Sequence, residues 1–186
     1  MRIISGKNKG KRLVAPAQLP VRPTTDFAKE ALFNILNNHY YFDELSVLDL
    51  FAGTGNISYE FASRGASGIV SVDNHHGCVR YIGKIAQELD FPIDAIKSDV
   101  YEFLKRTSQK FDLIFADPPY DFEISKFENL VFLVFENQLL TDGGTLVIEH
   151  SKHTDLSELA HFAYDKRYGG SVFSFFELPP REEDDE

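Results

Sequence analysis

Hydrophobic positions in the N-terminal part of the chain follow two different periods. Residues 26–38 repeat apolar side chains every three to four positions, from Ala28 to Leu36. This spacing predicts an amphipathic helix, capped by one of the two threonines before it. Two short β-prone runs, 2–4 and 12–14, flank a turn rich in glycine and lysine, which predicts a β-hairpin. A proline-rich stretch joins the hairpin to the helix and is expected to be extended.

From residue 46 the pattern becomes an alternation of short apolar runs and longer amphipathic runs. The apolar runs predict strands at 47–51, 68–73, 94–97, 111–116 and 145–149. The amphipathic runs predict helices at 56–64, 76–89, 100–107 and 126–137. Such an alternation is typical of an α/β fold with a mostly parallel sheet covered on both faces. Two further β-prone runs, 162–168 and 171–178, flank a Gly-Gly pair and predict an antiparallel hairpin at the end.

Composition narrows the class of protein. The 186 residues are enough for one sizeable domain, and 43% hydrophobic residues exclude a mainly disordered chain. The apolar runs are too short to span a membrane, and the first residues lack an apolar export signal. The single cysteine excludes an internal disulfide and a cysteine-based metal site, which suits a reducing cytoplasm.

Charge is distributed unevenly. The whole chain carries a net charge of −10, whereas residues 1–30 hold seven basic side chains against two acidic ones. A basic arm on an acidic body can contact phosphates while the rest of the protein does not, so the arm is a candidate nucleic-acid surface. The alternative is a set of solvated charges without a partner.

A glycine-rich turn follows the first predicted strand of the core. Gly53-Thr54-Gly55 lets the backbone approach a ligand, and the next helix offers free N–H groups, although Ser58 replaces the third glycine of a dinucleotide fingerprint. Asp73 ends the second strand, where an acid can accept hydrogen bonds from both ribose hydroxyls of an adenosine. Asp99 ends the third strand and could meet the adenine amine, or cap the next helix.

The strongest chemical signal is Asp117-Pro118-Pro119-Tyr120, at the end of the fourth strand. Ligands in open α/β sheets bind outside the carboxyl ends of the strands, so these residues are expected beside the glycine turn. The two prolines fix the backbone and remove two donors, which leaves acceptors facing the ligand. Tyr120 adds a ring for stacking. Acceptors beside a stacking ring suit a planar base that carries an NH2 group.

These residues lead to a family resemblance. Asp49–Gly55 together with Asp117–Tyr120 resembles the class I S-adenosylmethionine-dependent methyltransferases that act on exocyclic amines. More narrowly, the chain resembles the RsmD family, whose members methylate a guanine N2 in small-subunit (16S) ribosomal RNA. The stretches that carry this narrower likeness are 1–6, 22–26, 30–36 and 63–66. One departure is Phe27, where the family usually has a basic residue.

The resemblance implies a Rossmann-like, seven-stranded class I methyltransferase sheet, with its last strand antiparallel and inserted beside the fifth. It implies S-adenosylmethionine as cofactor and ribosomal RNA or the small ribosomal subunit as partner. The residues expected to hold the cofactor are Asp49, Phe51, Gly53, Thr54, Gly55, Asp73, Asn74, Asp99 and Val100. Those expected to hold the target amine for catalysis are Asp117, Pro118, Pro119 and Tyr120. Those expected to bind RNA are Arg2, Lys7, Lys9, Lys11, Arg12 and Arg22, on an arm expected beside the mouth of the pocket.

The predicted organisation has three parts. Residues 1–40 form a basic hairpin and helix packed on the core, residues 41–180 form the methyltransferase core, and residues 181–186 form an acidic tail. We expect a cytoplasmic monomer that does not bind a membrane. We also expect no metal site, because the six histidines lack a recognisable ligand spacing.

Three other functions remain open from the sequence. An adenine-N6 DNA methyltransferase also uses an Asp-Pro-Pro-Tyr motif, but a separate target-recognition domain is missing here. A nicotinamide-dependent oxidoreductase is disfavoured by the missing third glycine and by the Pro-Pro turn. A non-catalytic RNA-binding protein would not need the full set of acids at the strand ends.

Overall fold

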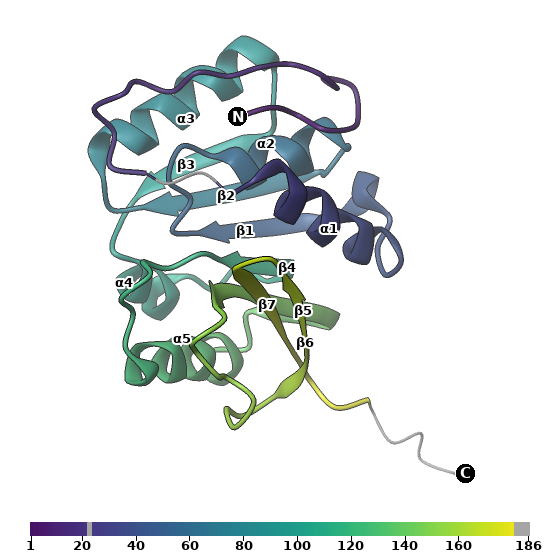
Figure 1. The fold of residues 1–186 in the computed structure, drawn as a ribbon, viewed down its shortest axis with the longest axis vertical. Helices are drawn as coiled ribbons and strands as arrows, with labels where there is room; N and C mark the ends of the chain where they lie inside the picture. Colours follow the sequence, from purple (N-terminus) through teal and green to yellow (C-terminus); the bar gives the residue numbers. More distant parts are fainter. Residues whose placement is uncertain (22–23, 181–186) are drawn as a thin grey trace.

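Seven strands form one sheet in the order β3-β2-β1-β4-β5-β7-β6 (Figure 1). In the computed structural model, which describes residues 1–21 and 24–180, the strands are β1 (Ser46–Leu50), β2 (Gly68–Asp73), β3 (Ile93–Lys97), β4 (Phe111–Ala116), β5 (Leu140–Ser151), β6 (Phe162–Tyr168) and β7 (Ser171–Glu177). Strands β1 to β5 run parallel, and β7 is antiparallel to both β5 and β6. The predicted fold class is confirmed, including the insertion of the last strand beside the fifth.

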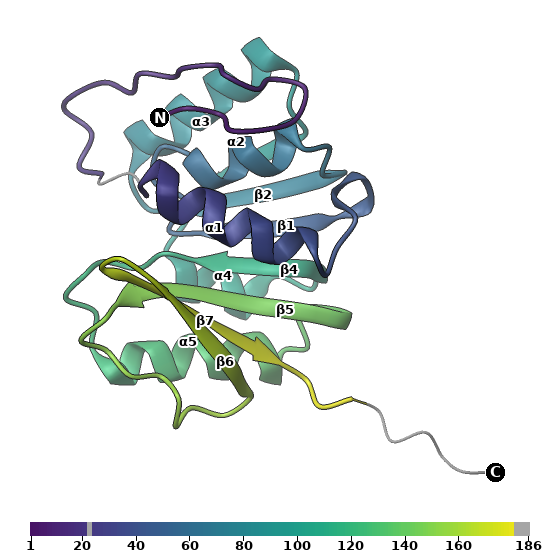
Figure 2. The same cartoon turned by 45° about the vertical axis from the view of Figure 1, so that its right-hand side comes forward.

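Helices cover both faces of this sheet (Figure 2). They are α1 (Asp26–Asn37), α2 (Asn56–Ser63), α3 (His76–Leu89), α4 (Val100–Arg106) and α5 (Ile124–Glu136), with a short 3₁₀ turn, η1 (Phe42–Glu44). The apolar sides of α1, α2 and α3 share one core with one face of the sheet, and α4 and α5 share a second core with the other face. The central strands are therefore buried on both sides, which is why they read as continuous apolar runs.

Most element ends lie within two residues of the prediction, whereas β5 begins at Leu140 and ends at Ser151 where the sequence predicted 145–149. The first core strand ends at Leu50 because Phe51 adopts a left-handed φ of 57° and starts the turn. Strand β5 extends to Ser151 because its antiparallel ladder with β7 continues to that residue. The N-terminal hairpin forms a single bridge, Arg2–Arg12, rather than two strands.

The N-terminal arm, residues 1–14, is held by a buried charge network on α2. Glu60 accepts hydrogen bonds from the backbone N–H groups of Ile4 and Ser5, at 2.8 and 3.1 Å. The same carboxylate pairs with Lys29 at 3.2 Å and with Arg64 at 2.9 Å. Lys29 and Glu60 are both fully buried, so the network fixes the arm against the body of the protein.

Candidate active site at the carboxyl edge of the sheet

The turn after β1 takes its shape from glycine. Gly53 and Gly55 adopt φ angles of 57° and 89°, a region that other residues rarely enter. A Cβ on Gly55 would lie 2.6 Å from the ring of Tyr59, so this glycine also lets α2 pack closely under the turn. The backbone N–H of Gly53 donates to the carboxylate of Asp73 at 2.9 Å, which joins the turn to the end of β2.

Asp73 holds two loops together at this edge. One carboxylate oxygen accepts from Gly53, and the other accepts from the backbone N–H of His75 at 2.9 Å. Each oxygen keeps a further lone pair, so the half-buried carboxylate can still accept from a ribose diol. Asn74 is exposed directly beside it. The geometry fits the predicted ribose contact, which stays a prediction.

Asp49 lies beneath the turn. Its side chain is only 2% exposed and accepts a 2.6 Å hydrogen bond from the hydroxyl of Ser58, which also contacts Ser71. Burial raises the pKa of Asp49 to about 7, and the charge of Asp73 adds to this shift. The serine in place of the third glycine therefore has a structural reason, because it satisfies a buried acid. Whether Asp49 contacts the cofactor stays a prediction.

Asp99 caps α4 and remains exposed. One carboxylate oxygen accepts from the backbone N–H of Glu102 at 3.1 Å. The side chain of Val100 is buried in the core, so only its backbone is available to a ligand. Capping occupies one oxygen, and the second can still meet an adenine amine.

The Asp-Pro-Pro-Tyr segment begins where β4 ends. Its first residue, Asp117, follows Ala116, which pairs with Leu50 of β1 and Ile148 of β5. Among the residues that the structure describes, no group donates a hydrogen bond to the Asp117 carboxylate. Burial raises its pKa well above the usual range, and the charges of Glu149 and Asp49 raise it further. Beyond the prolines, Tyr120 is 67% exposed at the rim.

Glu149 is a site residue that the sequence prediction missed. It ends the predicted fifth strand, and its side chain is 7% exposed in a small pocket that it shares with Asp117, Pro118 and Tyr120. The hydroxyl groups of Thr24 and Ser171 donate to its two oxygens at 3.2 and 3.1 Å. Burial raises its pKa. The available signal was an acid at the carboxyl end of a parallel strand, the same signal that identified Asp73.

His150 also lines this pocket. Its Nδ1 lies 2.9 Å from the carbonyl of Ser151, which can only accept, so Nδ1 carries the proton. Its Nε2 then accepts from the hydroxyl of Ser174 at 2.7 Å. Burial lowers the pKa of His150, which keeps the ring neutral and fixes the end of β5.

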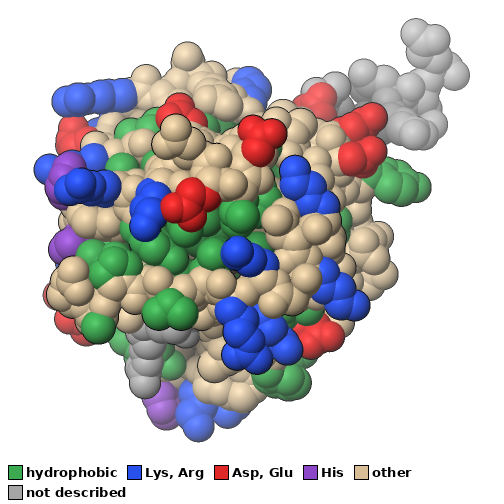
Figure 3. All heavy atoms as spheres, turned by 90° about the horizontal axis from the view of Figure 1, so that it is seen from above, with side chains coloured by type: hydrophobic (Ala, Val, Ile, Leu, Met, Phe, Trp, Pro, Cys, Tyr) green, Lys and Arg blue, Asp and Glu red, His purple; other side chains and the backbone are tan. Residues whose placement is uncertain are grey.

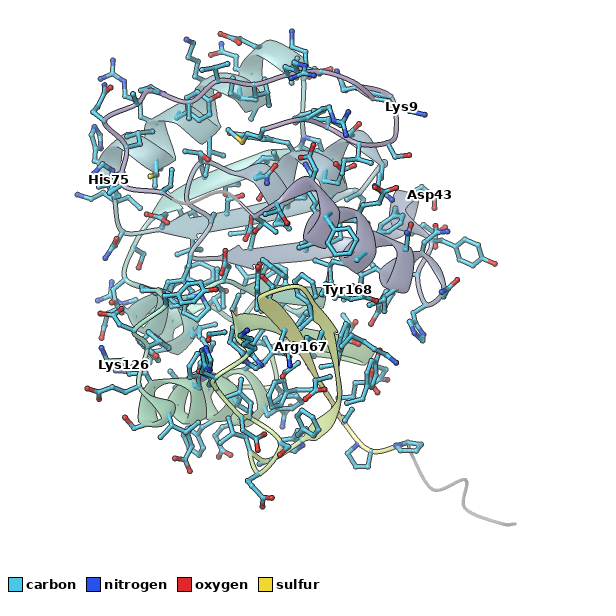
Figure 4. The ribbon with its side chains drawn as sticks, viewed as in Figure 1. Lys9, Asp43, His75, Lys126, Arg167 and Tyr168 are labelled. Carbon is cyan, nitrogen blue, oxygen red and sulfur yellow. The ribbon has the colours of Figure 1, made fainter. Side chains whose placement is uncertain are left out.

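The basic arm lies differently from the prediction. Its base is near the glycine turn, where Met1 contacts the Thr54 hydroxyl at 3.7 Å. Its tip is fixed to the far end of α2, because Lys7 donates its backbone N–H to the carbonyl of Ser63 at 2.8 Å. Figure 4 places Lys9 on the opposite side of the molecule from His75, which follows the carboxyl end of β2. The prediction that the whole arm sits beside the pocket is therefore wrong for its tip.

The other predicted RNA contacts differ in how they are held. The side chain of Arg2 pairs with Asp26 at 3.2 Å. Arg12 is exposed, and its backbone pairs with that of Arg2 in an isolated β-bridge. Lys11 is exposed, as are Lys7 and Lys9. Arg22 and the acidic tail lie outside the described residues. Phe27 is 65% exposed and meets Tyr168 edge to face, with 6.2 Å between the rings.

The described residues have two further features to compare with this site, a second cavity and the arrangement of possible metal ligands. A larger cavity of about 400 Å³ lies at the opposite edge of the sheet, around Tyr40 and Thr145. Within residues 1–21 and 24–180, no group of three His, Cys, Asp or Glu side chains is arranged to hold a metal ion. No helix in the same ranges has the length and apolar character needed to cross a membrane.

The chain matches known proteins over nearly its full length. The family model described as "Conserved hypothetical protein 95" matches residues 1–177. It is the model of the RsmD family. The chain belongs to the RsmD family. Ribosomal RNA small subunit methyltransferase D of Haemophilus influenzae is 30% identical over 161 residues, covering 84% of this chain and 81% of that one. The Bacillus subtilis protein YlbH is 36% identical over 163 residues, covering 85% and 86%.

A solved structure shares this fold over nearly the whole chain. The Thermus thermophilus protein TTHA0928 superimposes with a TM-score of 0.82 at 26% identity, covering 96% of this chain and 99% of that one. The predicted family and enzyme class, an S-adenosylmethionine-dependent methyltransferase, are confirmed.

Proposed function

We propose that this protein methylates the exocyclic N2 amine of a guanine in small-subunit ribosomal RNA. The observation that carries the proposal is the half-buried Asp117 carboxylate, which lines a small pocket together with Glu149 and Tyr120. The pocket measures only about 20 Å³, so it suits the edge of a base while the ring stacks at the rim. The name of the Haemophilus relative supports ribosomal RNA as the substrate.

The residues at the carboxyl edge fit the expected methyl donor. Asp73 offers two carboxylate oxygens to a ribose diol, and Asp99 offers one to an adenine amine. The glycine turn leaves room for close approach of the backbone. S-adenosylmethionine, when bound, supplies an electrophilic methyl group on its sulfonium.

The protein's part in the reaction is positioning. The lone pair of a guanine N2 is delocalised into the ring, so the amine is a poor nucleophile. Acceptance of its two hydrogens by the Asp117 carboxylate and the Pro118 carbonyl favours a tetrahedral nitrogen, whose lone pair is then directed at the methyl group. Asp117 also stabilises the positive charge that develops on the nitrogen and can receive its proton. The base must be unpaired or flipped out to reach the pocket.

Several finer points belong to the same proposal. The protein acts as a monomer in the cytoplasm, on ribosomal RNA or on the small subunit. The arm supplies the RNA contacts, through Arg2, Lys7, Lys9, Lys11 and Arg12. The surface seen from above the arm shows Lys and Arg side chains interspersed with acidic ones, so positive charge is spread over this face (Figure 3).

A methyl-transfer assay tests the proposal. Tritium-labelled S-adenosylmethionine is offered to ribosomal RNA and small subunits from cells that lack the protein, and also to DNA. We expect label in N2-methylguanosine from the RNA. Label in N6-methyladenine from the DNA would instead support the adenine-specific alternative.

Variants locate the chemistry. Asp117→Ala is expected to lose most single-turnover methyl transfer while its affinity for S-adenosylmethionine stays within a few fold, because Asp117 acts on the amine. The exposed Asp121→Ala is the matched control and should behave like the parent. Asp73→Ala should lose cofactor affinity by about 10- to 100-fold, as expected for a hydrogen bond to a charged group. A normal transfer rate in Asp117→Ala would remove Asp117 from the mechanism.

A further inference from the structure

Asp117 and Glu149 lie side by side because of the strand register. The small pocket that they line together with Pro118 and Tyr120 is called the target pocket below. Ala116, the last residue of β4, pairs with Ile148 of β5, and Asp117 and Glu149 are the next residues, so their backbones leave this pair side by side, about one strand spacing of 4.8 Å apart. Side chains alternate along a strand, so both acids project from the face that carries α1. Both line the same pocket.

Glu149 is held there as a hydrogen-bond acceptor. Hydroxyl groups from two separate elements donate to it, Thr24 before α1 and Ser171 at the start of β7. Each hydroxyl takes a different oxygen, which fixes the plane of the carboxylate and leaves further lone pairs open. Burial raises the pKa of Glu149, and its charge raises that of Asp117 in turn. Hydrogen-bond donors from a bound base would offset the free-energy cost of keeping each of these two carboxylates charged.

The chemistry of the bases then separates guanine from the others. Two ring nitrogens flank the guanine N2 amine: N1 carries a hydrogen, and N3 carries a lone pair. In adenine, the ring nitrogen beside the N6 amine is N1, which carries a lone pair. In cytosine, the ring nitrogen beside the N4 amine is N3, which also carries a lone pair. An acceptor on the N1 side of the amine site therefore binds guanine and repels the other two bases, because a buried lone pair facing a carboxylate remains unpaired.

We propose that Glu149 selects guanine by accepting the N1 hydrogen of the base, while Asp117 and Pro118 hold its N2 amine. This inference rests on the proposed function and adds a specificity-determining residue to it. Glu149 then distinguishes guanine from adenine and cytosine, while Asp117 activates the amine.

A base analogue tests the role directly. 2-Aminopurine keeps the amine at C2 but has a lone pair at N1. RNA carrying either guanine or 2-aminopurine at the mapped target nucleotide is prepared by ligation, and kcat/KM is measured for both. The parent protein should prefer guanine by about 100-fold, the cost of leaving a buried acceptor unpaired. Glu149→Gln should narrow this ratio at least tenfold, because an amide N–H can donate to the N1 lone pair.

Controls separate selection from support of the fold. Glu128→Gln changes an exposed glutamate on α5 and should keep the parent ratio. Glu149→Asp keeps an acceptor on a shorter side chain, so it should transfer more slowly and still prefer guanine. Binding of S-adenosylmethionine checks that each variant is folded. A Glu149→Gln variant that slows on both bases equally, with an unchanged ratio, would overturn the inference.

Failure of the proposed function gives a different result. A parent protein that methylates adenine and not guanine would refute both proposals, because adenine N1 would then face the Glu149 carboxylate. A parent that methylates guanine and 2-aminopurine equally would refute only the role of Glu149.

Discussion

At the scale of single residues, the target pocket concentrates carboxylates where the fold makes them costly. Asp117 and Glu149 are neighbours in the register, and burial raises the pKa of both. A carboxyl group whose pKa is raised by burial on folding destabilises the folded state at pH values above its unfolded pKa. The cost grows until the pH passes the folded pKa. Two neighbouring carboxylates therefore lower the stability of the free protein above about pH 4, as expected of groups kept for binding rather than for folding.

Asp117→Asn should stabilise the free protein. The substitution removes one of two adjacent buried charges, and its amide can donate to Glu149. The gain should be small near pH 4, where the unfolded aspartate is half protonated, and larger at pH 8. At pH 8 we expect a rise in Tm of about 2–4 °C, the shift that roughly 1 kcal/mol produces in a chain of this size.

Thermal melts at several pH values measure this effect. Asp121→Asn, at an exposed position, is the control and should leave the Tm unchanged at every pH. A Tm for Asp117→Asn that is equal to the parent's at pH 8 would show that the Asp117 carboxylate carries no such cost.

The sequence predicted most of this site but not its second acid. Asp73, Asp99 and Asp117 could be identified because each ends a strand beside a recognisable turn or motif. Glu149 also ends a predicted strand, but neither a glycine turn nor a recognisable motif follows it in the sequence. Its role depends on Thr24 and Ser171, which are 125 and 22 residues away in sequence. Only the folded structure brings these three side chains together.

At the scale of elements, α2 joins the arm to the core. Every residue of α2 is buried, and polar side chains at Asn56, Glu60 and Ser63 lie one turn apart on the side that meets the arm. Ser63 donates to the carbonyl of Ser5 at 2.7 Å. A Cβ on Gly6 would lie 1.9 Å from the carbonyl oxygen of Ser63, so this crossing requires glycine. The unusual polarity of this helix thus reflects the chain that covers it.

Glu60→Gln should destabilise the protein strongly. It leaves Lys29 buried with only neutral partners, and breaking one side of a buried ion pair costs about 3–5 kcal/mol. We expect a fall in Tm of about 10 °C. Amide hydrogen exchange at Ile4 and Ser5 should accelerate, because both N–H groups lose a charged acceptor.

A surface pair provides the control for this prediction. Glu88 pairs with Lys84 at 3.8 Å, with both side chains more than half exposed, so Glu88→Gln should change the Tm by about 2 °C or less. If both variants melted at the same temperature, the network would not hold the arm.

The elements themselves were largely predictable, because period and turn residues are local signals. Helix α3 and strands β2, β4 and β6 lie where the pattern placed them. The way the arm is held was not predictable, because Glu60 and Ser63 on α2 bind its backbone in addition to the bonds between its two short runs. Such side-chain partners leave no periodic trace in the sequence.

At the scale of the whole molecule, the residues predicted to bind RNA lie away from the residues predicted to act on the base. The target pocket lies at the carboxyl edge of the sheet, whereas the arm tip is fixed to the opposite end of α2. The body is acidic, so attraction to RNA must come from local positive charge. Phosphate contacts at the tip would strengthen binding without touching the reacting base.

Replacing Lys7, Lys9 and Lys11 by Ala should therefore weaken RNA binding without slowing the methyl transfer. Each lost phosphate contact reduces the log–log salt slope by about 0.7, so the slope should flatten by up to roughly two units. The single-turnover rate at saturating RNA should stay at the parent value. The matched control replaces Lys105, Arg106 and Lys110, three exposed basic residues in and just after α4, and removes the same charge. Equal salt slopes in the two triple variants would mean that only total charge matters and that the arm tip makes no RNA contact.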